Sequence, residues 1–427
     1  MNFNLNDLDK KLLADKLIQL YVDNKFVDAR NFFNQFQVVL EQFDIDLNYI
    51  NNNQNINNID NILLIQLDSL GDCVLASAFF RELKNNYPKT NIDIIIDTQY
   101  KDLLINCPYI NNIIEFDTIK NKNVTDVINF CKDNLWNIQY DLAINLNWDY
   151  LEPAALLNFL SFSKYRLAYR SNEYERYCCD LQYERQHYAH RNYLDQYFYT
   201  HIIDNPFDMW REAERKLWIL SILNKKIESN KLEVWFNNDD LEFTKQFIDF
   251  SKKNIILGLG GKDLNSKYPV EDLAKAINQI NDNNRYIIVD KIDYHDEANL
   301  LADLLINKDT INLVNKLTLN QLSALISLSD LYIGNFSGII HLVEALNKPA
   351  IAIMKEAVEC EADHPGYLSL YNRYKPKNNN IIILRPEYCI DKCIEIPVFG
   401  GCCSNFAHCI TQILPDEIVE AYTNING

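Results

Sequence analysis

The feature that most constrains this chain is an alternation of short apolar runs with helical patterns, which begins at Asn61 and begins again at Asn254. The runs are rich in β-branched residues and apolar at consecutive positions, so both faces of each strand must be covered. Parallel strands joined by helices satisfy that requirement. We therefore predict an α/β protein with two tandem, doubly wound Rossmann-like domains that face a cleft.

The two alternations set the expected domain boundaries. The first predicts an N-terminal domain over residues 61–230, and the second predicts a C-terminal domain over residues 231–427. Residues 1–47 have helical spacing and predict a helical extension of two antiparallel helices, whereas the Asn-rich residues 48–60 predict a linker. Residues 171–210 interrupt the first alternation with Tyr, Arg, Glu and His, which is typical of a lid or of a solvated helical face.

Composition excludes several classes of partner. The net charge of −18 disfavours nucleic acid and purely electrostatic adhesion to an anionic membrane. The first residues lack the basic and apolar regions of a signal peptide, and no uninterrupted apolar stretch reaches about 18 residues. We expect a cytoplasmic protein with at most peripheral contact with the inner membrane, and the sequence is compatible with an oligomer.

The chain contains only ten glycines, and several of them follow predicted strands. In the first such segment, Leu67-Asp-Ser-Leu-Gly-Asp, Gly71 predicts a tight turn and Asp72 stands at the start of the next helix, toward the cleft. A carboxylate there suits a general base, although it equally suits a helix N-cap. The segment lacks the glycine pattern of dinucleotide-binding folds, and it excludes a P-loop.

The second segment, Gly258-Leu-Gly-Gly, opens the second alternation. Gly260 and Gly261 allow backbone N–H groups to approach an anion closely, and Lys267 adds a positive charge. In an acidic chain, a lysine on such a loop indicates a phosphate site, with an ordinary surface lysine as the alternative.

The third segment is Gly334-Asn-Phe-Ser-Gly-Ile-Ile-His. Ser337 and Gly338 begin a predicted helix, whose free N–H groups and dipole favour a phosphate. His341 lies one turn into that helix, either beside the phosphate or as a structural histidine.

The C-terminal region, residues 388–409, holds five of the eleven cysteines. Clustered thiols with glycines between them suggest a structural zinc or iron site. The spacing is not that of a regular two-knuckle zinc motif, so reduced thiols and disulfides remain alternatives. The candidate metal ligands are Cys389, Cys393, Cys402, Cys403 and Cys409.

Together the segments resemble the ADP-heptose:lipopolysaccharide heptosyltransferases, glycosyltransferase family 9. The resemblance covers residues 61–422 and is carried by Ile62-Leu-Leu-Ile-Gln-Leu-Asp-Ser-Leu-Gly-Asp, Phe80-Arg-Glu-Leu-Lys-Asn-Asn-Tyr-Pro, Lys267-Tyr-Pro and Gly334-Asn-Phe-Ser-Gly-Ile-Ile-His-Leu. It implies a GT-B fold and an inverting transfer from an ADP-heptose-like nucleotide sugar to a glycolipid or protein acceptor. It also implies that transfer needs no metal or other cofactor. Relatives that glycosylate autotransporter proteins carry an iron-bound cysteine cluster, which makes that branch an option.

The resemblance also assigns roles. Asp72 matches the catalytic base, Lys267 the lysine on the donor diphosphate, and Glu297 the acid on the ribose. Leu317 matches the residue along the adenine. Ser337, Gly338 and His341 match the phosphate-binding helix start and its histidine.

Phe336 departs from the family pattern, which usually has an aspartate there that contacts the donor sugar. We hypothesise that this substitution alters sugar specificity. The alternative function is a non-catalytic assembly or scaffold protein that retains the GT-B fold, and a sugar epimerase is a weaker third option.

Overall fold

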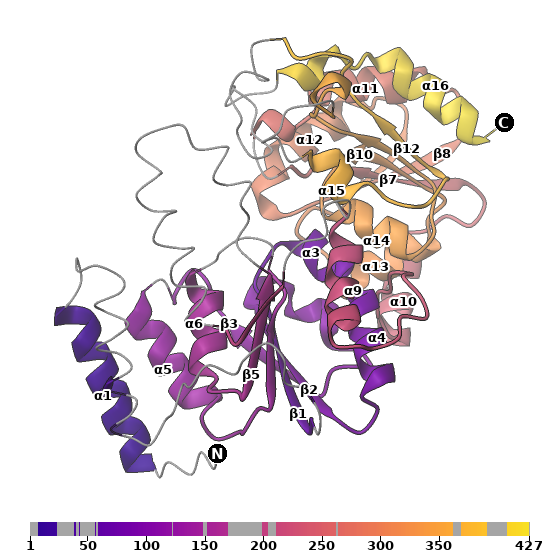
Figure 1. Ribbon diagram of the computed structural model, residues 1–427. Helices are drawn as coiled ribbons and strands as arrows, with labels where there is room; N and C mark the ends of the chain where they lie inside the picture. Colours follow the sequence, from indigo (N-terminus) through magenta and orange to yellow (C-terminus); the bar gives the residue numbers. More distant parts are fainter. Residues whose placement is uncertain are drawn as a thin grey trace.

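The computed structural model describes residues 7–23, 38–39, 42, 56, 59–121, 123–147, 152–169, 199–203, 211–261, 264–361, 369–390 and 408–426. These residues form two six-stranded parallel sheets with helices on both faces (Figure 1). The prediction of two doubly wound α/β units is confirmed. Most of the second predicted N-terminal helix, most of the Asn-rich linker and residues 171–198 lie outside the described residues.

The first sheet, sheet A, has the strand order β3-β2-β1-β4-β5-β6. The order reverses direction between β1 and β4, which pair from Ile62 with Leu142 to Ile65 with Asn145. The short strand β6 is absent from the prediction and lies within residues 171–210, the segment interpreted as a lid or a solvated helical face. The strands are β1 (Asn61–Gln66), β2 (Asn91–Asp97), β3 (Asn112–Phe116), β4 (Leu142–Asn145), β5 (Tyr165–Tyr169) and β6 (His201–Ile203).

Both faces of sheet A are covered, as the continuous apolar runs require. Leu63 and Ile65 point into an apolar cluster with α1, α5 and α6, whereas Ile62 and Leu64 point into a cluster with α3, α4 and α9. Full burial of each such side chain contributes about 1.5–3 kcal/mol. The covering helices are α1 (Asp7–Asp23), α3 (Leu70–Leu75), α4 (Ser77–Asn86), η1 (Thr98–Leu104), α5 (Val124–Asn134), α6 (Glu152–Leu160) and α9 (Glu212–Ile222).

The second sheet, sheet B, has the order β12-β11-β10-β7-β8-β9. Counted from its own first strand, β7, this is the same arrangement as in sheet A, with the reversal between β7 and β10. The edge strand β12 is again absent from the prediction. The strands are β7 (Lys253–Gly258), β8 (Asn284–Val289), β9 (Asp309–Asn312), β10 (Leu331–Asn335), β11 (Ala350–Ile353) and β12 (Ile381–Leu384).

Helices also cover both faces of sheet B. One apolar cluster lies between the sheet and α11, α12 and α16. The cluster on the other face, with α13 and α14, is continuous with the α3, α4 and α9 side of sheet A, so the two halves share a core. The helices are α10 (Asn238–Lys245), α11 (Val270–Gln279), α12 (His295–Leu304), α13 (Leu319–Leu328), α14 (Ile339–Ala345), α15 (Leu370–Tyr374) and α16 (Pro415–Asn426).

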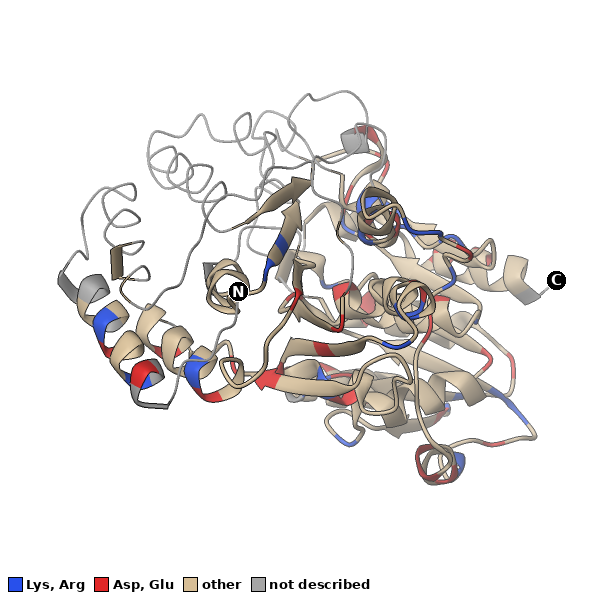
Figure 2. Ribbon diagram, turned by 60° about the horizontal axis from the view of Figure 1, so that its bottom comes forward, with Lys and Arg blue, Asp and Glu red and all other residues tan. Residues whose placement is uncertain are grey.

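Charged residues of both signs are interspersed over the helices and loops of the described ribbon, including α1 (Figure 2). Among the described residues, no helix combines the length and the apolar character that crossing a membrane requires.

Candidate functional site

The three glycine-containing segments occupy equivalent places in the two sheets. The first follows β1, the second follows β7 and the third follows β10. Each therefore stands at the carboxyl end of a strand that flanks a reversal of strand order, which is where doubly wound sheets bind ligands. Figure 1 shows α3, α9, α14 and α15 gathered where the two halves meet.

The first and third segments are in direct contact. A Cβ atom added to Gly71 would lie 2.8 Å from His341 Cδ2, and one added to Gly338 would lie 2.9 Å from Leu70 Cβ and 3.0 Å from Gly71 N. Such distances leave no room for a side chain at either glycine. The close approach of α3 and α14, rather than a special backbone conformation, therefore accounts for both glycines.

Asp72 lies at this junction and is 5% exposed. Ser69, rather than Asp72, is the N-cap of α3, so the alternative interpretation of Asp72 as an N-cap is wrong. Both carboxylate oxygens accept hydrogen bonds: Oδ2 from Ser69 Oγ at 2.8 Å, and Oδ1 from the Tyr374 hydroxyl at 3.2 Å. The carboxylate is thus held by one donor from each half of the molecule.

His341 is buried, and its ring lies against Gly71, the residue before Asp72. Its ring meets the Phe336 ring edge to face, with centroids 6.2 Å apart, and its Nδ1 lies 3.5 Å from Glu344 Oε2. Glu344 also accepts a hydrogen bond from Arg211 of the segment that leads into α9. Burial opposes ionisation of Glu344, but the hydrogen bond with His341 and the charge of Arg211 outweigh it and lower its pKa.

Lys267 and Glu297 are brought together, as their assigned roles on one donor would require. Lys267 Nζ lies 2.9 Å from Glu297 Oε1 and 4.3 Å from the centroid of the Tyr294 ring. Tyr294 also accepts a hydrogen bond from Gly261 N at 2.9 Å. The N–H of Gly261 is therefore used inside the protein, and Lys267, which is itself paired with Glu297, is the candidate phosphate ligand of the second segment.

Gly260 faces the carboxylate of Asp290, the residue that follows β8. A Cβ atom added to Gly260 would lie 2.8 Å from Asp290 Oδ2, an atom that is buried without a hydrogen-bond partner among the described residues. Burial raises the pKa of Asp290 to about 6, although the N–H groups of Lys291, Gly260 and Leu259 oppose the shift. Sequence reasoning missed this acid because Asp290 ends a strand without any accompanying motif.

Phe336 and Leu317 are half-buried on the same side of sheet B. Phe336 continues from β10, and its N–H donates to Ile353 O at 2.8 Å. Ser337 follows Phe336 and is also half-buried. The third segment therefore presents an aromatic ring where the resemblance leads one to expect a carboxylate.

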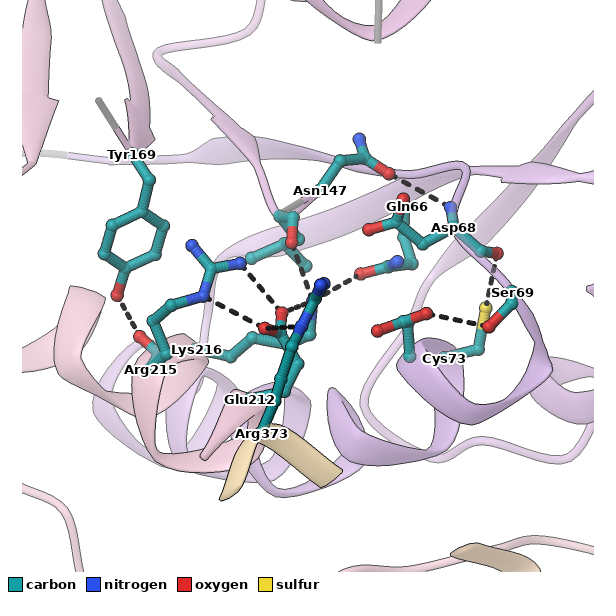
Figure 3. A network of polar contacts seen from close by, with 12 residues as sticks. Gln66, Asp68, Ser69, Cys73, Asn147, Tyr169, Glu212, Arg215, Lys216 and Arg373 are labelled. Carbon is teal, nitrogen blue, oxygen red and sulfur yellow. Dashed lines mark hydrogen bonds and ion pairs between the residues drawn. The ribbon is translucent and has the colours of Figure 1, made fainter. Parts of the chain in front are cut away.

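A buried group of charges lies between α9, the end of β1 and α15 (Figure 3). Glu212 pairs with Arg215 at 2.8 Å, Lys216 at 2.9 Å and Arg373 at 3.5 Å, and Lys216 Nζ also donates to Gln66 Oε1 at the end of β1. Burial alone would raise the pKa of Glu212, but the three cations outweigh it and lower that pKa. The sequence shows charges at helical spacing in α9, but it does not indicate that they are buried or that Arg373 joins them.

Two of the five candidate metal ligands are described. The N–H of Ile390, which follows Cys389, donates to Cys409 Sγ at 3.4 Å, and Cys409 Sγ lies 3.5 Å from His408 Nδ1. Cys393, Cys402 and Cys403 lie outside the described residues. Within the described ranges, no group of three or more His, Cys, Asp or Glu side chains is arranged to hold a metal ion, so the predicted metal site has no support there.

Comparison with known proteins places the chain in a family. The profile of glycosyltransferase family 9 (heptosyltransferase) matches residues 131–359, more than half of the chain. The lipopolysaccharide core heptosyltransferase OpsX of Haemophilus influenzae is 25% identical over 68% of this chain and 78% of its own length. Lipopolysaccharide heptosyltransferase 1 of Campylobacter coli is 25% identical over 75% of this chain and 88% of its own length.

A solved structure confirms the fold. The family 9 glycosyltransferase of Veillonella parvula superposes with a TM-score of 0.67, covering 86% of this chain and 98% of its own, at 16% sequence identity. At that identity the likeness concerns the fold alone, and it agrees with the predicted GT-B arrangement. Because the family profile spans more than half of the sequence, the chain belongs to glycosyltransferase family 9 and is a glycosyltransferase.

Proposed function

We propose that this protein transfers a heptose-type sugar from an ADP-sugar to an acceptor hydroxyl, with inversion at the anomeric carbon and with Asp72 as general base. The observation that carries the proposal is the position of Asp72: it follows β1 of sheet A, its neighbour Gly71 lies against the third segment of sheet B, and its carboxylate accepts a hydrogen bond from Tyr374. A base from one half thus stands next to the proposed donor site of the other.

The proposed reaction needs one proton transfer and one displacement. Asp72 takes the proton of the acceptor hydroxyl as that oxygen attacks the anomeric carbon. The new carbon–oxygen bond forms on the face opposite the leaving group, and the electron pair of the broken bond departs with the phosphate of ADP. Attack from the opposite face inverts the configuration.

The donor side of the site supplies charge for the departing ADP. Lys267 is the proposed diphosphate ligand, and its ion pair with Glu297 at 2.9 Å places it beside the proposed ribose contact. Ser337 and Gly338 complete the proposed phosphate surroundings, with Leu317 along the adenine, whereas Gly260 and Gly261 contribute only the close approach of the loop because their N–H groups face Asp290 and Tyr294. Fixed positive charge and dipoles stabilise a leaving group without reorganisation, so we propose transfer without a metal.

The acceptor is proposed from the relatives. Both curated relatives are named as lipopolysaccharide heptosyltransferases. We propose a lipopolysaccharide core acceptor for this chain, at the cytoplasmic side of the membrane, with a surface protein as the other acceptor class. Phe336 suggests a sugar other than ordinary heptose, because an aromatic ring forfeits charge-assisted hydrogen bonds to hydroxyls, each worth about 1.5–3 kcal/mol.

A donor screen tests the proposal. The purified protein is incubated with heptose-deficient lipopolysaccharide and with each of several ADP-sugars and UDP-sugars, and products are followed by mass spectrometry. We expect one ADP-sugar to be consumed and its sugar to appear on the acceptor. Efficient turnover of ADP-heptose would sink the idea that Phe336 alters specificity, and consumption of UDP-sugars alone would contradict the proposed donor class.

The non-catalytic scaffold is the second candidate, and Phe336 is the observation that favours it. Nucleotide-dependent thermal stabilisation separates the two, because a ligand at 100 times its Kd adds about 2.7 kcal/mol of stability. A shift with ADP supports the transferase, and the absence of a shift with any nucleotide or nucleotide sugar supports the scaffold.

The cysteine cluster of the C-terminal region is proposed, separately, to hold structural zinc or iron. The nearness of Cys409 to the Ile390 N–H, next to Cys389, supports only part of that ligand set. Metal analysis of the purified protein and of a Cys389→Ser variant tests it: about one bound metal per chain that is lost in the variant is expected, and metal-free wild-type protein ends the proposal.

A further inference from the structure

The carboxylate of Asp72 receives a hydrogen bond from a residue far away in the chain. Tyr374, the last residue of α15, donates its hydroxyl to Asp72 Oδ1 at 3.2 Å, while Ser69 Oγ donates to Oδ2 at 2.8 Å. Burial and the charge of Asp72 raise the pKa of Tyr374 well above its usual value. The phenol therefore keeps its proton and acts as a donor at any physiological pH.

The helix that carries Tyr374 is tied to the N-terminal half by its neighbours. Arg373 Nε lies 3.5 Å from Glu212 Oε2, and Arg211 Nε donates to Lys375 O at 2.9 Å. A third tie joins Lys377 Nζ to Glu214 Oε1 at 2.6 Å. All three ties end on or next to the first turn of α9, and α9 packs on α4 and on α3, the helix that carries Asp72. Docking of α15 on α9 thus fixes where the Tyr374 hydroxyl lies.

We propose that Tyr374 is a positioning residue for Asp72, supplied by the C-terminal half, so that the carboxylate takes its working orientation only when α15 is docked on α9. The proposal rests on the proposed role of Asp72 as general base. A carboxylate held by one donor on each oxygen cannot turn about its bond to Cβ, and the lone pairs that remain are aimed in fixed directions. Misplacement of a reacting group by about 1 Å can cost a hundredfold in rate.

The test removes one hydroxyl and compares two tyrosines of the same helix. Tyr374→Phe deletes the donor, and Tyr371→Phe is the matched control, because the Tyr371 ring contacts Lys375 and Arg385. ADP release is measured with heptose-deficient lipopolysaccharide and the ADP-sugar that the donor screen identifies. We expect kcat to fall about tenfold to a hundredfold in Tyr374→Phe, with the donor KM within about twofold of wild type and with the control unchanged. A Tyr374→Phe kcat equal to or above that of the control overturns the proposal.

A second readout does not depend on turnover. Amide hydrogen exchange over residues 69–75, followed by mass spectrometry, should be several-fold faster in Tyr374→Phe than in Tyr371→Phe. If wild-type protein releases no ADP with any of the ADP-sugars screened, the proposed function fails and exchange alone decides the role of Tyr374. In that case, equal exchange in the two variants overturns the positioning role.

Discussion

The two halves of this protein share one sheet topology but place different chemistry at the same point of it. At the reversal in sheet A, the strand ends carry an acid, Asp72, over a fully buried set of ion pairs centred on Glu212. At the reversal in sheet B, they carry glycine loops and a lysine, Lys267. Lys267 forms a partly exposed ion pair with Glu297. The fold therefore fixes where a ligand can bind, and the residues that follow each strand decide which part of the reaction each half performs.

The difference also concerns how each reversal is held. In sheet A, buried charges join α9 to Arg373, a residue of the C-terminal half, so the first half is stabilised by a contact with the second. In sheet B, Gly258 leaves room for the side chain of Tyr332, and Gly334 lies directly against the backbone of Gly258. Removing a charge should therefore lower stability most at the reversal in sheet A, and adding a side chain should lower it most at the reversal in sheet B.

The largest effect is expected from removing the charge of Glu212. Glu212→Gln leaves three cations without their buried partner, which should destabilise the protein by about 3–5 kcal/mol. Because the folded-state pKa of Glu212 is lowered, its contribution is present above the ordinary pKa of a glutamate and is lost as the pH falls through the lowered value. Urea unfolding at neutral pH measures the loss. Glu228→Gln, which breaks an exposed pair with Lys226, is the control and should change stability by less than about 1 kcal/mol.

The next largest effects are expected from adding a methyl group at two glycines of the third segment, Gly334 and Gly338. A Cβ atom at Gly334 would lie 2.1 Å from Gly258 O, a backbone atom, so Gly334→Ala should cost about 3 kcal/mol of stability. A Cβ atom at Gly338 would instead meet Leu70 across the junction of the halves. Gly338→Ala should cost less stability, about 1–2 kcal/mol, but should lower kcat by separating α3 from α14. Equal kcat in Gly338→Ala and wild type, at unchanged stability, would contradict the tight junction.

Loss of the lysine charge should affect donor binding rather than stability. Lys267→Met removes the proposed diphosphate ligand, and a charge-assisted hydrogen bond is worth about 1.5–3 kcal/mol, so the Kd for ADP should rise about tenfold to a hundredfold. Titration calorimetry with ADP measures it. Lys275→Met, which removes a surface lysine paired with Asp272, should leave the Kd within about twofold. An unchanged Kd in Lys267→Met would remove this lysine from the donor site.

The effect confined to the narrowest range of conditions concerns Asp290, because it appears only below about pH 6. Its pKa is raised to about 6 by burial, so the folded state holds this proton more tightly than the unfolded chain does. Wild-type stability should therefore decline as the pH rises from about 4 through 6, by up to about 2 kcal/mol. Asp290→Asn should lack this part of the decline, as measured by chemical unfolding at several pH values. Parallel pH profiles for the two proteins would show that Asp290 is not the group responsible.

Most of the fold could be predicted because its central strands are continuous apolar runs, such as Ile62–Leu67 and Ala350–Met354, bounded by helices with clear periodicity. The edge strands β6 and β12 are three and four residues long and only partly buried, so their patterns are weak. The run Ile381–Leu384 is itself apolar, and it is the one signal that could have indicated β12.

Some residues of the candidate site could likewise be predicted from the sequence, and others could not. Asp72, Lys267 and His341 could be selected because they follow predicted strands, and position after a strand is visible in a sequence. Tyr374 and Arg373 could not, because they act through contacts with residues more than a hundred positions away. Asp290 follows a strand as well, but nothing in its neighbourhood distinguishes a buried carboxylate from an exposed one.

The central claim is that the two halves supply a base and a donor site to one reaction. Its most direct test is the rate of ADP release by Asp72→Asn at saturating donor and acceptor, using the sugar identified in the screen, with the affinity for ADP measured on the same preparation. The account predicts a fall in kcat of about 10²–10⁴-fold with the ADP affinity unchanged. A kcat within about twofold of wild type would contradict the account.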